Sequence, residues 1–248
     1  MNDKSIPRTV MITGAYGGIG YDLAQGFLRR RENVVLNGRN SDKLSAAAQR
    51  LDRPSSIALV AGDIGERSTG ERLVATAVER FGSVDVLINN AGIFYPKAFL
   101  DSKEDDLEKF FYTNLKGTYL TSQAAARQMV VQGEGGAIIN IGTVLVDHAI
   151  TGFPASAALT SKGAVHALTV SLSAELAPYN IRVNTVVPGV IRTPLHDGAS
   201  VDDYAGIHPL NRVGEVAEIT DAVIYLASAT YTTGVILAVD GGYRVGRR

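Results

Sequence analysis

Three glycines near the amino terminus have the spacing of a loop that binds a diphosphate. They stand at positions 14, 18 and 20 of the sequence TGAYGGIG, residues 13–20, directly after a short apolar run. Gly14 lets the chain turn sharply, Gly18 lets the backbone approach a ligand, and Gly20 lets a helix pack closely on a strand. The free N–H groups at the start of that helix attract phosphate oxygens. The strand–turn–helix context therefore predicts a dinucleotide site.

The residues after the second apolar run bear on which dinucleotide binds. An acid there would accept a hydrogen bond from a ribose 2′-OH, whereas a guanidinium would pair with a 2′-phosphate. The sequence NVVLNGRNSDK, residues 33–43, has Gly38 at the expected place of the acid, followed by Arg39. This pattern favours NADP. NAD stays the alternative, because Arg39 can be a solvated loop cation and the glycine loop itself has no basic residue.

Short runs rich in β-branched residues alternate with longer helical patterns. The near-continuous apolar character of the short runs is typical of parallel strands that helices cover on both faces. The predicted strands are Thr9–Thr13, Asn33–Asn37, Ile57–Ala61, Val84–Asn89, Ala137–Ile141, Ile181–Val187 and Val235–Val239. The predicted helices are Ile19–Arg30, Ser41–Leu51, Gly65–Phe81, Ser102–Gln132, Ser156–Ala177 and Glu215–Ser228.

This alternation predicts an α/β fold of the Rossmann type. We expect a doubly wound, mainly parallel seven-stranded sheet in a three-layer α/β/α arrangement. Ligands of such folds bind beyond the carboxyl ends of the strands, where the glycine loop would lie. The segment 193–213, rich in Asp, Gly and Pro, is the longest irregular stretch. It is predicted to be a lid over a substrate, with a plain connector as the alternative.

The composition excludes several classes of site. The 248 residues include no cysteine, which excludes disulfides and thiolate chemistry, and the four histidines lack the spacing of metal ligands. A net charge of −1 gives no general attraction to nucleic acid or to an anionic membrane. The length suits a single domain, 1–248. Without a long apolar run or an apolar leader, the chain is expected to be cytoplasmic and to act on a small molecule.

The motifs along the chain resemble those of the short-chain dehydrogenase/reductase family in its classical form. In chain order they are TGAYGGIG at 13–20, Asp63, NNAG at 89–92, Asn114, Ser161–Lys162, PG at 188–189 and Thr193. The sequences HPLNRVGEVAEI at 208–219 and TTGVILAVDGG at 232–242 are similar to the bacterial branch that includes 3-oxoacyl-carrier-protein reductases. The resemblance extends from about Val10 to Gly242.

The resemblance implies an NAD(P)-dependent oxidoreductase that acts on a carbonyl or alcohol substrate. Asp63 would bond the adenine amine, and Asn89 and Ala91 would line the ribose pocket of the adenosine. The nicotinamide would lie against 188–189 and Thr193. The implied cofactor residues are Thr13, Gly14, Tyr16, Gly18, Ile19, Gly20, Arg39, Asp63, Ile64, Asn90, Ala91, Gly92, Lys162, Pro188, Gly189, Ile191 and Thr193.

The implied catalytic residues are Asn114, Thr143 and Lys162. Lys162 would bond the nicotinamide ribose, Asn114 would anchor a water that links Lys162 to solvent, and Thr143 would polarise the carbonyl. Two of the assignments have ordinary alternatives: Asp63 can be a turn or helix N-cap residue, and Asn114 can be a buried amide bonded to backbone. The family commonly forms tetramers, so a dimer or tetramer is implied, built on Ser102–Gln132, Ser156–Ala177 and Val235–Val239.

The sequence departs from the family at two positions of the active site. Thr143 replaces the usual serine and keeps a hydroxyl. Ala158 stands four residues before Lys162, where the family has the tyrosine that protonates the developing alkoxide. No tyrosine occurs between Tyr119 and Tyr179, so a shifted alignment cannot supply one. Such a general acid is worth about 10²–10⁴ in rate, or roughly 3–5 kcal/mol of barrier, and cofactor binding does not need it.

Four interpretations of Ala158 stay open. Another side chain replaces the phenol, a water held by Lys162 and Thr143 relays the proton, the alanine is engineered, or reductase chemistry is lost. In the last case the chain is a catalytically silent NAD(P)-binding regulatory or structural subunit. Nucleotide-assisted non-redox chemistry is a third function. The candidate substitutes for the phenol are Ser156, Thr160, His148, Tyr95, His196 and Tyr204.

The space left by the missing phenol has two predicted uses. Phe153 and Leu159 can fill it, or a bulkier substrate can bring an acidic group of its own. An apolar-to-mixed substrate pocket is predicted, with the alternative that its residues belong to the core or to an interface. These residues are Tyr95, Phe99, Leu145, Phe153, Leu195 and Tyr204.

Overall fold

Seven strands pair in parallel in one sheet, in the order β3-β2-β1-β4-β5-β6-β7. The computed structural model describes residues 7–193 and 201–246. The strands are β1 (Thr9–Ile12), β2 (Asn33–Gly38), β3 (Ile57–Ala61), β4 (Val86–Asn89), β5 (Gly136–Ile141), β6 (Ile181–Pro188) and β7 (Ile236–Val239). The predicted doubly wound fold is confirmed, and its sheet is parallel throughout.

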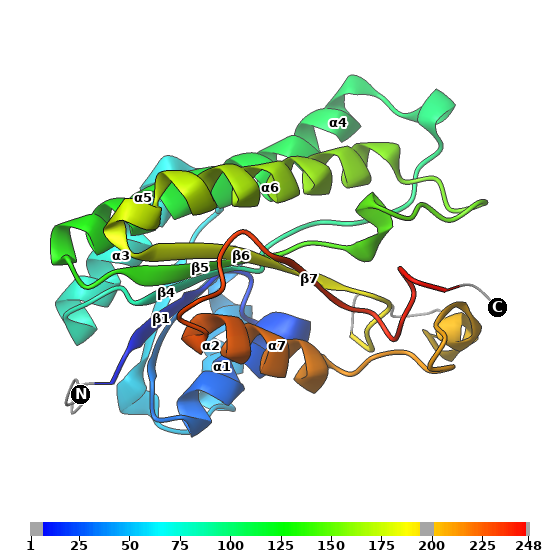
Figure 1. The fold of residues 1–248 in the computed structure, drawn as a ribbon. Helices are drawn as coiled ribbons and strands as arrows, with labels where there is room; N and C mark the ends of the chain where they lie inside the picture. Colours follow the sequence, from blue (N-terminus) through cyan, green and yellow to red (C-terminus); the bar gives the residue numbers. More distant parts are fainter. Residues whose placement is uncertain (1–6, 194–200, 247–248) are drawn as a thin grey trace.

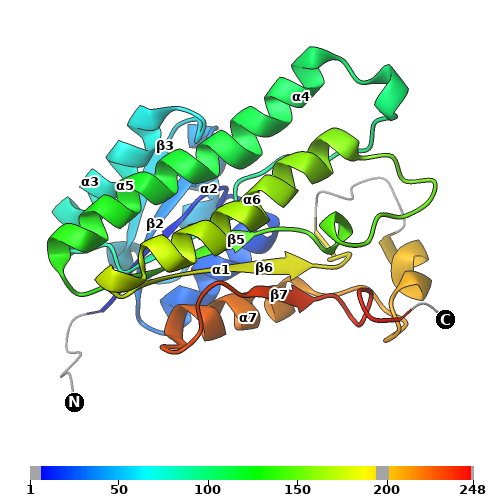
Figure 2. The same cartoon turned by 45° about the horizontal axis from the view of Figure 1, so that its top comes forward.

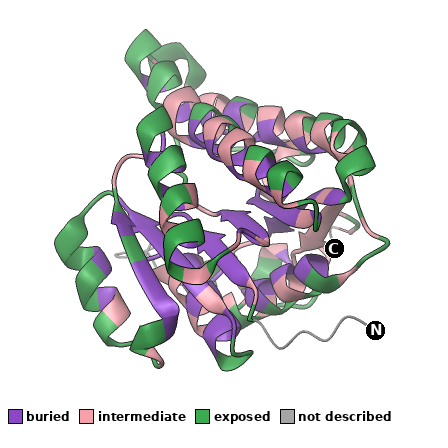
Figure 3. Ribbon diagram, turned by 90° about the vertical axis from the view of Figure 1, so that its left-hand side faces the viewer, coloured by how far each residue is buried: buried purple, intermediate pink, exposed green. Residues whose placement is uncertain are grey.

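Helices cover both faces of the sheet (Figure 1). One face carries α1 (Gly18–Arg29), α2 (Ser41–Gln49) and α7 (Val216–Ser228), and the other carries α3 (Arg67–Phe81), α5 (Gly117–Gln132) and α6 (Ser156–Glu175). Each layer has its own apolar cluster between helices and strands. Figure 3 shows buried strands between helices whose outward sides are exposed, which explains why the strand sequences are apolar on both faces.

The register places β1 between β2 and β4. Val10 is opposite Val34 of β2 on one side and Val86 of β4 on the other. Because the strands are parallel, their carboxyl ends meet at the same edge, and the helices return the chain to the other edge (Figure 2). The loops after β1, β2, β4, β5 and β6 are therefore neighbours.

The long helix predicted at Ser102–Gln132 is present from Glu104 to Gln132, but it is not α-helical throughout. The structure has α4 (Glu104–Phe110), a π-helical segment η3 (Phe111–Lys116) and then α5. The hydrophobic pattern did not reveal the break, because a π-helical turn adds only one residue to the local repeat. This π-helical segment contains Asn114, one of the predicted catalytic residues.

The segment predicted as a lid is described only in part, because 194–200 lie outside the described residues. Its described part includes the 3-10 helix η7 (Val201–Ile207). The remaining short 3-10 helices are η1 (Pro54–Ser56), η2 (Phe99–Asp101), η4 (Val144–Val146) and η5 (Ala177–Tyr179). No helix in the described part of the chain combines the length and the apolar character needed to cross a bilayer.

Candidate functional site

A cleft of about 850 Å³ lies at the carboxyl ends of the strands. This is the place where open α/β sheets bind ligands, and the volume suits a small organic molecule. The loops after β1, β2, β4, β5 and β6 line it, together with η7. The predicted site residues in its lining are Gly14, Tyr16, Gly18, Ile19, Arg39, Asp63, Ile64, Asn90, Ala91, Gly92, Thr143, Lys162, Pro188, Gly189, Ile191 and Thr193. One continuous cavity thus brings together most of the residues predicted for cofactor and for chemistry.

The glycine loop has the backbone shape that its spacing predicts. Gly14 has φ +66° and Gly18 has φ +52°, which L side chains rarely adopt. A Cβ at Gly20 would lie 2.3 Å from the carbonyl oxygen of Gly14, so only glycine lets α1 start this close to the turn. The start of α1 lines the cleft with free N–H groups, which fits a diphosphate.

Three residues predicted near the cofactor lie behind the cleft. Thr13 is buried and its Oγ1 accepts hydrogen bonds from the backbone N–H groups of Asn90 and Ala91, at 3.1 and 2.9 Å. Gly20 packs against the turn. Asn89 is predicted in the ribose pocket but is buried. Its Nδ2 donates instead to Ser122 Oγ and Asn140 Oδ1, both within the core. Thr13 thus holds the loops after β1 and β4 together, and Asn89 ties β4 to α5 and β5.

The end of the cleft near β2 carries two cations. Arg39 and Lys43 are both exposed and both line the cavity. No carboxylate among the described residues lies within ion-pair distance of either. Sequence reasoning missed Lys43, which lies in the first turn of α2, where Asn40 Oδ1 caps its N–H at 2.8 Å. Two unpaired cations suit a 2′-phosphate better than a 2′-hydroxyl.

Asp63 makes the turn contact weighed as its alternative role, and it also lines the cleft. Its Oδ1 accepts a hydrogen bond from the N–H of Gly65 at 2.9 Å, which is the turn contact predicted as the alternative. The residue also lines the cleft, so its other oxygen is available to an adenine amine.

Lys162 and Thr143 meet at the other end of the cleft. Lys162 is only 8% exposed, and its Nζ donates to the carbonyl oxygen of Ile141 at 2.7 Å. Burial lowers the pKa of this amine to about 8, because the charged form is poorly solvated. Thr143 Oγ1 accepts from Leu145 N–H at 3.3 Å, so its hydroxyl proton is free to bond a substrate oxygen.

Asn114 lies behind these residues and is almost fully engaged. Its Oδ1 accepts from Ile93 N–H at 2.8 Å, and its Nδ2 donates to Ile93 O at 3.0 Å and to Ser161 Oγ at 2.9 Å. This is the buried amide weighed as the alternative role. One lone pair of Oδ1 remains for the predicted water. A Cβ at Gly92 would lie 3.1 Å from both Asn114 Oδ1 and Lys162 Nζ, so both groups converge on that glycine.

Ala158 does not open onto the cleft. It is 1% exposed and belongs to an apolar cluster with Phe110 and Ala155. Phe153 packs on this cluster and lines the cleft, and its ring is stacked on Phe94 with centroids 6.2 Å apart. Leu159 also packs there. The structure thus has the filled arrangement predicted as one of two uses of the space.

The candidate substitutes for the phenol divide into two groups. Tyr95 and Tyr204 line the cleft, and Tyr95 packs on Phe110 with ring centroids 4.5 Å apart. Outside the lining are Ser156, Thr160 and His148, and His196 lies outside the described residues. Among the predicted substrate residues, the lining includes Tyr95, Leu145, Phe153 and Tyr204, whereas Phe99 is 75% exposed elsewhere and Leu195 is not described. Sequence reasoning missed His208 and Tyr243, which also line the cleft.

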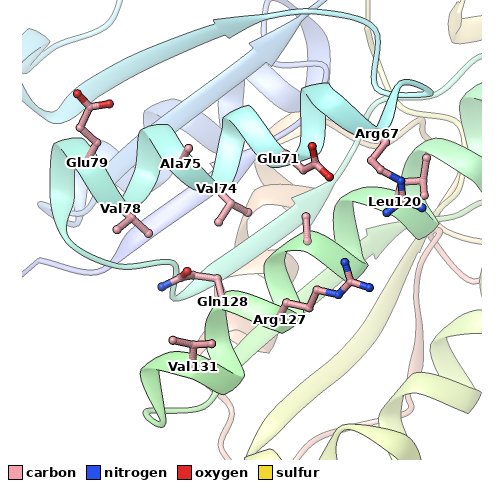
Figure 4. A pocket seen from close by; sticks show the side chains of 11 residues that line it. Arg67, Glu71, Val74, Ala75, Val78, Glu79, Leu120, Arg127, Gln128 and Val131 are labelled. Atoms are coloured by element: carbon pink, nitrogen blue, oxygen red, sulfur yellow. The ribbon is translucent and has the colours of Figure 1, made fainter.

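A second groove, of about 640 Å³, runs between α3 and α5 on the outer surface (Figure 4). Its middle is apolar, with Val74, Val78 and Val131, and its rim carries Arg67 and Glu71. It lacks the converging buried polar groups of the first cleft. Across the described residues there is no cluster of three potential metal ligands.

The chain is similar in sequence and in structure to known proteins. Residues 14–244 match the family model described as Enoyl-(Acyl carrier protein) reductase. L-rhamnose 1-dehydrogenase (NAD(P)(+)) of Azotobacter vinelandii is 39% identical over 250 residues, which cover 96% of each chain. Glucose 1-dehydrogenase of Gluconobacter oxydans is 37% identical, covering 97% of this chain and 93% of the relative. A crystal structure of a short-chain type dehydrogenase/reductase from Mycobacterium marinum has a TM-score of 0.90 at 35% identity, with 97% of each chain covered.

Proposed function

This chain belongs to the short-chain dehydrogenase/reductase family, and from that premise we propose that it oxidises a sugar or similar hydroxylated small molecule with NADP. Relatives in the family are NAD(P)-dependent dehydrogenases, which makes an NAD(P)-dependent oxidoreductase the general assignment. One observation carries the proposal: a single cleft joins the glycine loop to Thr143 and Lys162.

The residues present fit a dinucleotide. The turn at Gly14 and Gly18 would bind the diphosphate, Asp63 the adenine, and Arg39 with Lys43 the 2′-phosphate that distinguishes NADP from NAD. Pro188 and Gly189 line the far end, where the reactive ring would lie. When bound, the nicotinamide accepts the hydride from the carbon that is oxidised.

The chain's own groups manage the substrate oxygen and its proton. The hydroxyl of Thr143 would donate a hydrogen bond to the substrate oxygen. The proton that the substrate hydroxyl loses would pass through a water to the amine of Lys162. The pKa of about 8 makes this amine a usable acceptor near neutral pH, whereas an ordinary lysine would stay charged. The proposed site is thus atypical, since Ala158 offers no ionisable group.

A sugar hydroxyl at the anomeric carbon suits such a site. The ring oxygen withdraws electrons from that carbon, so the hydroxyl is more acidic than that of an ordinary secondary alcohol. Oxidation to a lactone therefore asks less of a base than oxidation of a simple alcohol does. Two relatives act, by name, at position 1 of a sugar, which supports this substrate class.

The test measures cofactor binding and turnover separately. Fluorescence titration should show NADPH binding that is tighter than NADH binding. With NADP and a panel of aldoses and cyclic alcohols, absorbance at 340 nm should show slow oxidation of aldoses. 3-Oxoacyl thioesters are assayed in the opposite direction, as acceptors of hydride from NADPH. The rate should rise as pH increases through about 8, because the neutral form of Lys162 is the acceptor. The matched variant Thr143→Val should lower turnover and keep cofactor affinity.

A catalytically silent NAD(P)-binding subunit is the second candidate. The apolar surroundings of Ala158 favour it, since no described group there can supply the missing proton. It predicts cofactor binding without turnover on any substrate of the panel, and assembly that depends on cofactor. Absence of cofactor binding at millimolar concentration would contradict both functions.

The assembly and the location of the protein are further proposals. A dimer or tetramer built on α5, α6 and β7 is supported by exposed apolar side chains on the two helices, among them Tyr119, Val131 and Val170. Light scattering would give the number of copies. A cytoplasmic location remains an expectation from composition.

A further inference from the structure

His208 connects two walls of the cleft through both of its ring nitrogens. The side chain is buried, at 4% exposure, and lines the cavity. The N–H of Val190 donates to Nε2 at 3.2 Å, and Nδ1 lies 3.1 Å from the carbonyl oxygen of Tyr204. A carbonyl oxygen only accepts and a backbone N–H only donates. The contacts therefore require a neutral ring with its proton on Nδ1.

The two partners belong to different elements. Val190 follows β6, next to Pro188 and Gly189, which line the end of the cleft assigned to the nicotinamide. Tyr204 belongs to η7, the described half of the predicted lid. A Cβ at Gly189 would lie 2.9 Å from Nε2, so the imidazole packs directly on this backbone. His208 thus joins η7 to the turn after β6 through buried contacts, beside the exposed ion pair between Arg192 and Asp202.

The groups that face His208 offer no compensation for a positive charge. Tyr243 lies beside the ring, with centroids 6.1 Å apart. The carboxylate of Asp240 accepts from the backbone N–H groups of Gly242 and Arg244, both at 2.9 Å. Other charged residues lie on the elements that flank His208. On η7, Asp202 pairs with Arg192, and Asp203 is its neighbour in the chain. Beyond Tyr243, Arg244 pairs with Asp147. None of these described carboxylates bonds the imidazole.

We propose that His208 is a positioning residue that holds the turn after β6 against η7 only in its neutral Nδ1–H form, so that cofactor binding weakens when the ring is protonated. This inference rests on the proposed function, because it needs the nicotinamide end of the cleft. Protonation adds a hydrogen to Nε2, so that Nε2 can no longer accept the hydrogen bond from the N–H of Val190 and two N–H groups face each other. The turn then loses the hydrogen bond to the N–H of Val190, and only the bond from Gly214 N–H to the carbonyl oxygen of Val190, at 2.9 Å, still holds this residue.

The first test reads the tautomer directly and needs no cofactor. Long-range ¹H–¹⁵N spectra of the wild-type protein at pH 7.5 should show one histidine with a protonated Nδ1 and an unprotonated Nε2. The variant His208→Gln should lack this signal, which assigns it. A protonated Nε2, or rapid exchange between the two tautomers, would overturn the proposal.

The second test follows NADPH and NADH affinity by calorimetry between pH 8 and pH 5.5. For the wild type, the dissociation constant should rise as the pH falls, by at most about tenfold per pH unit, as expected when binding releases one proton. His208→Gln keeps an acceptor for Val190 that cannot be protonated, so it should bind as the wild type does at pH 7.5 and lose most of the pH dependence. His208→Leu removes both bonds and should bind at least tenfold more weakly throughout.

Using NADH in parallel separates His208 from the titrating 2′-phosphate of NADPH. If NADH binding by His208→Gln depends on pH as steeply as binding by the wild type does, the proposed role of His208 is overturned and the proposed function is not. Failure of the wild type to bind either cofactor at every pH would instead overturn the proposed function. Circular dichroism of each variant shows whether a weak binder is still folded.

Discussion

The amine of Lys162 is a buried charge without a neutralising partner. No described carboxylate lies within ion-pair distance of Nζ, and its one bond is to the carbonyl oxygen of Ile141. Burial disfavours the protonated form, which is why its pKa falls from the ordinary 10.5 to about 8. The protein therefore loses stability to keep this group at the cleft.

Replacing Lys162 by methionine should stabilise the fold at neutral pH. The difference between a pKa of about 8 in the folded state and 10.5 in the unfolded state corresponds to roughly 3 kcal/mol of unfolding free energy. Losing the bond to Ile141 costs about 1 kcal/mol, so the variant should gain about 2 kcal/mol at pH 7 in urea denaturation. Between pH 8 and 10.5 the folded amine is neutral while the unfolded one is still protonated. Wild-type stability then rises with pH and the advantage of the variant disappears.

The exposed Lys109 offers a matched control for this measurement. Lys109→Met removes the same chemical group from the surface. Its unfolding free energy should stay within about 0.5 kcal/mol of the wild-type value at pH 7 and between pH 8 and 10.5. A Lys162→Met protein that is less stable than the wild type at pH 7 would show that the amine is held by stronger contacts than the single one to Ile141.

Placing a phenol at position 158 should require a second change. Ala158 is enclosed by Phe110 and Phe153, so Ala158→Tyr alone overpacks the cluster and should cost about 1–3 kcal/mol of stability. Combining it with Phe153→Ala gives the ring room beside the cleft. We expect the double variant to reduce carbonyl substrates about 10²–10⁴-fold faster than the wild type, measured as NADPH consumption.

Phe153→Ala alone is the control, since it opens space without supplying an acid. If the double variant is no faster than this control, the rest of the site has also changed and the silent-subunit interpretation gains support.

Individual elements show why the site was only partly predictable. The strands followed from β-branched, apolar runs, because burial on both faces leaves little room for polar residues. The break at η3 did not, since hydrophobic spacing is nearly the same on either side of a π-helical turn. The amide of Asn114 bonds both backbone groups of Ile93, a residue that follows β4. This tertiary contact, which no local pattern encodes, accompanies the interrupted helix.

Asn114→Ala should destabilise the protein and loosen the loop after β4. It removes the partners of the N–H and C=O of the partly buried Ile93, and each lost hydrogen bond costs about 1 kcal/mol. Thermal unfolding should show the loss of stability. Relative to the wild type, hydrogen exchange should become faster at Ile93 and change less in β1. The exposed Asn40→Ala change, which removes only the cap of α2, should cost about 1 kcal/mol and leave exchange at Ile93 unaltered. Equal exchange rates at Ile93 in both variants would contradict this role of Asn114.

The whole molecule determines how the site is assembled. Motifs recognisable in sequence lie at the ends of β1, β4, β5 and β6, and a parallel sheet brings such ends together whatever their separation along the chain. Lys43 and His208 were missed, because their place in the cleft depends on where α2 and η7 fall relative to the sheet. Sequence spacing predicts that motifs are neighbours but not which side chains from the covering segments reach them.

Cofactor binding should stabilise the entire fold by linkage. NADPH at 100 times its dissociation constant adds about 2.7 kcal/mol, which for a chain of this size raises Tm by about 5–10 °C. The same concentration of NADH should raise it less, since Arg39 and Lys43 then have no 2′-phosphate to bind. Arg39→Ala should shrink the difference between the two cofactors, and an unchanged difference would show that Arg39 is only a solvated cation.

The strand order also has a consequence for the growing chain on the ribosome. β1 lies between β2 and β4, so its second neighbour is synthesised only after β2, β3 and three helices have emerged. Until then the apolar edge of β1 has no partner and remains open to pairing with other chains. Nascent chains stalled before residue 86 should therefore bind chaperones more strongly than chains stalled after residue 141.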